Sequence, residues 1–248
     1  DAFHVAALMG KPIIDADPAG RSVPELQHST FYINDVPITP LAVATPFGDT
    51  AVINNVVNDL RAEDLVRAMS VVSKNMIGVT DHPVNGATLK KSVIPNAITY
   101  SLNIGKALRE ANEAGEDAAA AICEAAGGKI LFRGAVKDFG YDTVDGFTVG
   151  DAVLDGEGEY EGHEYKVWFK NEHILSYRDG EIDVTVPDLI CVIDSEGVPV
   201  TNPFYEKGQR LTIFALPAPK EWTTERGLEV FGPKSFGFDI EYVPFTEK

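Results

Sequence analysis

The chain has 248 residues, 44% of them hydrophobic, and its 21 Lys and Arg against 38 Asp and Glu give a formal net charge of −17. This length and apolar fraction are sufficient for one large domain or two ordinary ones with a buried core. The excess of acid disfavours nucleic acid and anionic membranes as partners, because like charges repel. No apolar run approaches the roughly 20 residues of a membrane span, so we expect a soluble protein.

Two cysteines, Cys123 and Cys191, lie far apart in the sequence. Their spacing matches neither a zinc site nor the disulfide framework of a small secreted domain. We therefore expect each to be a small buried side chain, and we expect the protein to be cytoplasmic, where thiols stay reduced.

The first half, residues 1–132, predicts an α/β (α+β) domain in which short apolar runs alternate with helical stretches. A helix ends at Gly10, and a strand follows at 13–16. A strand pair is expected at 41–45 and 51–54, joined by a tight turn. Helices are expected from residue 59 to before Gly78, then at 96–114 and 116–126, where two glycines end the last one.

The second half, residues 133–248, predicts an all-β barrel- or sandwich-like domain, because strand pairs and turns replace helical patterns. Strands are expected at 166–169, 173–177, 182–186, 189–193 and 210–215, with Asp179-Gly180 as a hairpin turn. We place the domain boundary near residues 132–134 and expect the C-terminal segment to pack back on the first domain.

The first candidate site follows the strand at 13–16, where Asp15 and Asp17 share one face because side chains alternate along a strand. Two neighbouring carboxylates can divide the roles of general acid and general base. Arg21 and Glu25 would lie at the rim of this site. In an open α/β sheet this strand end is where ligands bind. These four residues are therefore our catalytic candidates. The alternative is structural: Asp15 pairs with Arg21, and Asp17 caps the next turn.

The second candidate site joins Asn171 and Glu172, between two strands, with Asp188, which follows a proline that interrupts the ladder. Glu172 and Asp188 could face one pocket, so these three residues are candidates for substrate binding. The alternative is that residues 171 and 172 form a bulge or turn and that Asp188 accepts from backbone donors.

No cofactor motif is evident. The five histidines lack zinc-binding spacings, and neither a nucleophile elbow nor a phosphate loop follows a strand. We expect most of the histidines to be surface or capping groups. A divalent metal held by Asp15, Asp17 and a distant histidine is an alternative, and the identity of any metal is unknown.

Six short motifs together resemble one family, the S-methyl-thiohydantoin desulfurase-like proteins, whose genes commonly neighbour those of hydantoinase and oxoprolinase subunits. The motifs are Asp15-Ala-Asp17, Gly20-Arg21, Pro24-Glu25-Leu26, Asn171-Glu172, Pro187-Asp188-Leu189-Ile190 and Gly232-Pro-Lys-Ser-Phe236-Gly237. The resemblance implies an α/β domain followed by a β-rich one. It also implies a hydrolase of a cyclic amide or amidine ring, in which water adds between two ring nitrogens, a thiol leaves and a hydantoin remains.

The sequence differs from the family in one respect, because the family's longer N-terminal stretch with its glycine run is not recognisable here. The sequence therefore predicts that this part of the family is missing. The alternative function is a non-catalytic subunit or partner of a hydantoinase- or oxoprolinase-type enzyme, which would expose a broad apolar surface. Apart from a cyclic small molecule, the expected partners are a second copy of the chain or such an enzyme subunit.

Overall fold

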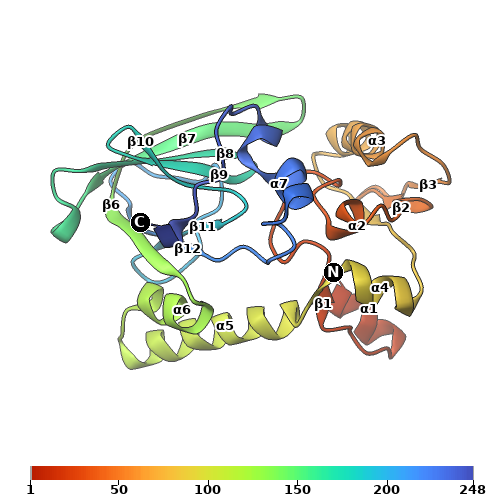
Figure 1. Ribbon diagram of the computed structural model, residues 1–248, viewed down its shortest axis with the longest axis horizontal. Coiled ribbons are helices and arrows are strands. Elements are labelled where there is room, and N and C mark those ends of the chain that lie inside the picture. The colour runs from red at the N-terminus through yellow and green to blue at the C-terminus, as the bar shows by residue number, and fades with distance from the viewer. Residues whose placement is uncertain (1, 248) are drawn as a thin grey trace.

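The computed structural model describes residues 2–247 as a small α+β region followed by a large curled antiparallel sheet (Figure 1). This confirms the expected fold class. Figure 1 shows the large sheet on one side, the small sheet with α3 on the other, and α7 between them. The elements of the first region are α1 Ala2–Met9, β1 Ala16–Asp17, α2 Thr30–Ile33, β2 Leu41–Ala44, β3 Thr50–Ile53, α3 Asp59–Val72, β4 Gly78–Thr80, α4 Gly86–Ser92, β5 Ile94–Pro95, α5 Ala97–Ala114 and α6 Ala118–Ala126.

The second region contains seven strands and a C-terminal helical segment. Its elements are β6 Lys129–Val144, β7 Phe147–Gly156, η1 Gly158–Tyr160, β8 Glu164–Lys170, β9 Glu172–Arg178, β10 Glu181–Thr185, β11 Leu189–Asp194, β12 Arg210–Leu216, α7 Glu225–Phe231, η2 Pro233–Phe236 and η3 Phe245–Glu247. The strand order is β10-β9-β8-β7-β6-β12-β11, and every pair in it is antiparallel. The predicted hairpin turn is confirmed, since Asp179 and Gly180 have φ of 50° and 87°.

Helix boundaries follow the residues that cap them. The Asn58 side chain accepts from the Arg61 N–H at the start of α3, and Asp117 accepts from Ala120 N–H at the start of α6. Gly115 and Gly127 end α5 and α6 with φ of 70° and 71°, a conformation that costs glycine little. The helices expected before each glycine are thus confirmed to within two residues.

The first strand differs from the expectation. Only Ala16–Asp17 form a strand, and it pairs antiparallel with β5. The ladder is short because Pro95 has no N–H to donate, and Asn96, with φ of 62°, turns the chain into α5. The other small sheet, β3-β2-β4, is antiparallel as well. The premise of an open sheet with ligands at its carboxyl edge is therefore wrong.

The two regions share buried surfaces. The inside of the curled sheet holds the largest apolar cluster, while α5 and α6 pack on β11 and β12. The predicted boundary at residue 132 falls within β6. A third cluster combines Ala19 with Trp222, Phe231 and Leu175, so the C-terminal segment contacts both the 18–33 stretch and β9. None of the helices formed by residues 2–247 combines the length and apolar character that crossing a bilayer requires.

Candidate functional site

Asp15 serves the backbone of a helix. Its Oδ1 accepts from the N–H groups of Ile98 and Thr99 at 3.0 Å each, and its Oδ2 accepts from the Thr99 hydroxyl at 2.6 Å. These hydrogen bonds from Thr99 and Ile98 lower the pKa of Asp15. Because Asn96 provides no side-chain cap, Asp15 satisfies the free donors of the first turn of α5.

Asp17 has a similar backbone role. Its Oδ1 accepts from Ala19 N–H at 2.7 Å and from Gly20 N–H, which closes the turn that follows β1. Gly20 has φ of 67°, and a Cβ there would lie 2.9 Å from Pro219. The turn therefore requires glycine at position 20, and Asp17 caps it as in the structural alternative.

Arg21 connects the turn to the large sheet. Its guanidinium donates to the carbonyls of Pro187 and Asp188 at 2.9 and 3.0 Å and lies 4.9 Å from the centroid of the Phe231 ring. Burial lowers the pKa of Arg21 to about 10, although Cys191, Glu172 and Asp188 act in the opposite direction. The group remains a cation at neutral pH and holds the 18–28 segment against the β10–β11 connection.

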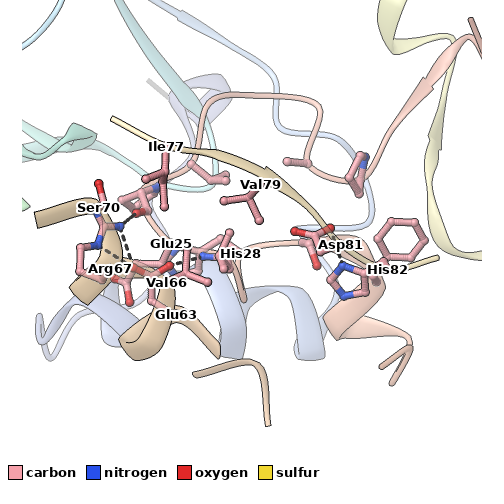
Figure 2. Close-up of a pocket in the computed structure, with 17 residues that line it drawn as sticks. Glu25, His28, Glu63, Val66, Arg67, Ser70, Ile77, Val79, Asp81 and His82 are labelled. Carbon is pink, nitrogen blue, oxygen red and sulfur yellow. Dashed lines mark hydrogen bonds and ion pairs between the residues drawn. The ribbon is translucent and has the colours of Figure 1, made fainter. Parts of the chain in front are cut away.

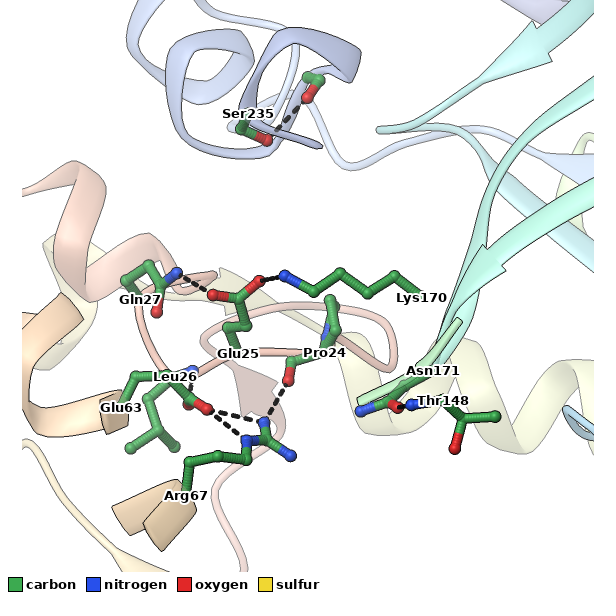
Figure 3. Close-up of polar contacts among 11 residues, drawn as sticks. Pro24, Glu25, Leu26, Gln27, Glu63, Arg67, Thr148, Lys170, Asn171 and Ser235 are labelled. Atoms are coloured by element: carbon green, nitrogen blue, oxygen red, sulfur yellow. Dashed lines mark hydrogen bonds and ion pairs between the residues drawn. The ribbon is translucent and has the colours of Figure 1, made fainter. Parts of the chain in front are cut away.

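Glu25 meets Lys170 across the two regions (Figure 3). Glu25 Oε1 accepts from Lys170 Nζ at 2.5 Å, and Oε2 accepts from Gln27 Nε2 at 2.7 Å. The side chains of Glu25 and Lys170 are only 16% and 25% exposed, so water screens the pair weakly. Burial alone would raise the pKa of Glu25, but the bonds from Lys170 and Gln27 and the charges of His28 and Lys170 hold it below its ordinary value.

A second ion pair fixes the backbone beside Glu25. Arg67 on α3 pairs with Glu63 at 2.7 Å and donates to the Pro24 carbonyl at 2.8 Å, while Glu63 accepts from Leu26 N–H at 2.9 Å (Figure 3). These bonds clamp residues 24–26 to α3. The Glu25 side chain is thus positioned from both ends, by the clamp and by Lys170.

His28 was not among the site residues that the sequence suggested. It is 3% exposed, and its ring lies 4.9 and 5.3 Å from the rings of Phe231 and Phe236. Burial lowers its pKa to about 4; Glu25 acts against this shift, and Lys170 and Arg21 add to it. The expectation of mostly surface histidines is wrong, because His82 and His173 are buried as well. The available signal was the position of His28, three residues after Glu25.

Glu25, Arg67 and His28 border a cavity of about 300 Å³, here called the smaller cavity (Figure 2). Its wall includes Glu25, His28, Glu63, Arg67, Asp81 and His82. The volume is at the lower end of the range of about 300–1,000 Å³ typical of small-molecule sites. His82 bonds Asp81 at 2.9 Å and lies 3.5 Å from Asp59, and it stacks on Phe31.

Asn171 and Glu172 line a different cavity of about 540 Å³, the larger cavity, with Ser22, His173 and Cys191 also in its wall. Asn171 has φ of 56°, unusual for a residue other than glycine, and its Oδ1 accepts from Thr148 N–H at 2.8 Å (Figure 3). Glu172 accepts from the Ser22 hydroxyl at 2.9 Å. The 18–28 segment therefore contributes to both cavities.

Neither Cys191 nor His173 is poised for covalent chemistry. Burial raises the pKa of Cys191 to about 12 despite Arg21, so the thiol stays protonated at neutral pH. His173 bonds the Ile190 carbonyl at 2.9 Å and the Tyr205 hydroxyl at 2.8 Å, so both ring nitrogens have partners. The expectation for Cys123 is confirmed, since it is 8% exposed, whereas Cys191 is only partly buried.

Asp188 is a buried anchor, 2% exposed. Its carboxylate accepts from Ala218 N–H, the Tyr242 hydroxyl and Phe245 N–H at 2.9–3.1 Å. These bonds fasten the C-terminal segment to the sheet, as the structural alternative expected. The structure thus gathers Arg21, Glu25, Asn171 and Glu172 at the junction of the two regions and assigns Asp15, Asp17 and Asp188 to the backbone.

Within residues 2–247 there is no cluster of three or more His, Cys, Asp or Glu side chains arranged to hold a metal ion. A site built on Asp15 and Asp17 is thus not assembled in the described part of the chain, because both carboxylates accept from backbone N–H groups.

The fold defines an α+β protein whose N-terminal region and curled antiparallel sheet meet at a polar junction. The chain belongs to the S-Me-THD-like family, because residues 57–245 match the family's C-terminal domain and residues 1–55 match its N-terminal domain. The expected absence of the family's N-terminal part is therefore not borne out. No curated protein shows significant similarity to the chain.

The fold is similar to that in a crystal structure of a protein from Chromobacterium violaceum. The two chains are 22% identical, with a TM-score of 0.75, and the match covers 97% of this chain and 68% of the other. At this level of identity, the likeness supports the fold alone.

Proposed function

We propose that the protein is a hydrolase of a cyclic amidine or amide ring such as an S-methyl thiohydantoin, releasing a thiol and leaving a hydantoin. Family membership suggests this class of substrate. One observation carries the proposal: Glu25, which pairs with Lys170 of the large sheet, and a buried histidine line one cavity of small-molecule size. Titratable groups with shifted pKa values that gather in a cavity are typical of catalytic sites.

The charges at this junction suit the reaction. Addition of water to the carbon between two ring nitrogens places negative charge on a ring nitrogen, and the departing sulfur also carries negative charge. The Lys170 ammonium, held by Glu25 of the cavity wall, is the cation that would stabilise such charge. Asn171 and Glu172 directly follow Lys170 in the sequence and line the larger cavity. They would bind polar groups of a substrate that reaches this cavity.

The test is release of thiol from an S-methyl thiohydantoin, followed with a thiol reagent. We expect release by the wild type and a loss of at least about 100-fold in kcat/KM for Glu25→Gln, because the ion pair with Lys170 is removed and the cavity loses the Glu25 carboxylate. His163→Gln is the control, since His163 is an exposed surface residue paired with Asp179. A chelator-treated sample tests metal dependence. A folded wild type that releases no thiol would contradict the proposal.

A role as a non-catalytic subunit is the second candidate, and α1 favours it. This helix buries none of its residues and exposes Phe3, Leu8 and Met9 by 57%, 76% and 64%. Exposed apolar patches of this kind often mark protein contacts. Co-purification with a hydantoinase-type enzyme, abolished by Leu8→Glu while thiol release stays absent, would favour this function over hydrolysis.

A further inference from the structure

His28 lines the smaller cavity with a buried nitrogen that has no partner. Its side chain is 3% exposed, and among residues 2–247 nothing hydrogen-bonds to Nδ1. Figure 2 places the ring beside Glu25 among the residues of the cavity wall. A buried polar atom left unpaired costs about 1–3 kcal/mol. Because His28 lines the cavity, a donor that reaches its ring there would satisfy Nδ1.

The ring is held in place without using Nδ1. Phe231 and Phe236 pack against it, and the His28 backbone N–H donates to the Glu25 carbonyl at 3.1 Å. The backbone and the two aromatic contacts fix the position of the imidazole relative to Glu25. The nitrogen is thus preorganised, and little conformational entropy is lost when it meets a substrate.

Charged groups surround His28 from several elements, and each is engaged elsewhere. On its own segment, Glu25 pairs with Lys170 of β8, and Arg21 donates to three carbonyls. On the cavity wall, Glu63 pairs with Arg67 on α3, and Asp81 pairs with His82 after β4. From α7 and η2, the aromatic rings of Phe231 and Phe236 contact His28.

His28 therefore differs from the other ionisable groups of the smaller cavity in the described chain, because those groups already have charged partners. Burial, Lys170 and Arg21 keep it neutral at pH 7, where an imidazole nitrogen can accept a proton. Nδ1 is that acceptor in the tautomer whose proton resides on Nε2.

We propose that His28 is the general base of the hydrolysis, taking a proton from the attacking water in the smaller cavity. This inference rests on the proposed function and adds a residue that the motifs did not include. The water oxygen forms a bond to the ring carbon between the two nitrogens. The π electrons of the C=N bond move to the ring nitrogen, and His28 takes the water proton and delivers it to that nitrogen.

The second half of the reaction uses the same nitrogen. His28 takes the remaining proton of the new hydroxyl, the carbonyl forms, and the carbon–sulfur bond breaks with its electron pair on sulfur. The protonated His28 then gives its proton to the departing sulfur. The sum is water plus the S-methyl ring giving methanethiol plus the hydantoin, and His28 returns to its neutral form. One residue thus serves as base and acid in both steps.

The experiment compares the wild type with His28→Gln, which keeps a polar side chain of similar reach but cannot titrate. We expect kcat to fall by about 100-fold or more while KM changes less than about threefold. The acid limb of the wild-type pH profile disappears in the variant. In His28→Ala, free imidazole restores part of the rate, which a merely structural residue would not allow. His163→Gln serves as the control.

Two outcomes separate this inference from the proposed function. Thiol release by the wild type with an unaltered kcat and acid limb in His28→Gln overturns the role of His28 alone. No release by a folded wild type overturns the proposed function and this role with it. If His28→Gln does not fold, histidine NMR of the wild type decides: hydantoin must shift the His28 ring signals and leave those of His163 in place, and an unshifted His28 signal overturns the inference.

Discussion

The turn after β1 and the junction around Glu25 both contain acidic residues from the same short stretch of sequence, yet they are used differently. Asp15 and Asp17 accept from backbone N–H groups of α5 and of the turn. Glu25 accepts from the side chains of Lys170 and Gln27, beside a histidine with an unpaired nitrogen. A carboxylate surrounded by backbone donors stabilises a fold, whereas one surrounded by side chains at a cavity can take part in chemistry. Four predictions test this division.

The largest expected loss of stability is at Asp188, which belongs with the backbone-binding carboxylates. Asp188→Ala leaves the donors of Ala218, Tyr242 and Phe245 without their buried acceptor. We expect the free energy of unfolding to fall by about 3 kcal/mol or more, measured by urea denaturation. Asp188→Asn, which retains one acceptor oxygen, should lose less. A change under about 1 kcal/mol in the Ala variant would show that Asp188 is not an anchor.

The second prediction is that the free energy of unfolding falls in acid because His28 is buried in its neutral form. Its pKa is about 4 in the folded protein, against an ordinary 6.5, so the unfolded chain binds the proton first as pH falls. The contribution of neutral His28 to the free energy of unfolding is complete above pH 6.5. It declines below that pH and is smaller by about 3 kcal/mol at pH 4. His28→Gln should remove this part of the decline in urea denaturation at pH 7 and 4. An equal decline in variant and wild type would contradict the burial of a neutral His28.

A smaller loss of stability is expected when the Glu25–Lys170 pair is broken. Lys170→Met leaves the partly buried Glu25 carboxylate without its cation, which we expect to cost about 2 kcal/mol. The rate of thiol release by Lys170→Met should fall about as far as that of Glu25→Gln. The double variant should release thiol no more slowly than either single variant. Additive losses of activity would show that the two residues do not act as a unit.

The smallest effect is expected at Asp15, which is exposed. Asp15→Asn should lower Tm slightly and leave thiol release unchanged, because its oxygens bind the start of α5. Its pKa is lowered in the folded protein, so its contribution is present above the ordinary pKa and is lost as pH falls through the lowered value. The Tm difference should therefore vanish in strong acid. Lost activity at neutral pH would instead support a catalytic Asp15.

Part of the candidate site could be proposed from the sequence, because Glu25, Asn171 and Glu172 stand in motifs that resemble those of one family. The pairing of Glu25 with Lys170 could not, since 145 residues separate them and only the approach of β8 to the 18–28 segment brings them together. The reverse holds for Asp15 and Asp17. Their spacing predicts a pair of acidic groups, but the donors that occupy Asp15 lie 83 and 84 residues away.

The sequence by itself determined part of the local structure: the helices that end at Gly115 and Gly127, the hairpin turn at Asp179-Gly180 and the change from mixed to β-rich pattern depend on neighbouring residues. The tertiary structure alone decided that the first strand is short and antiparallel, that three histidines are buried and that His28 lacks a partner at Nδ1. The physical reason is that burial and pairing depend on segments far apart in the chain, and no local pattern records which segments will meet.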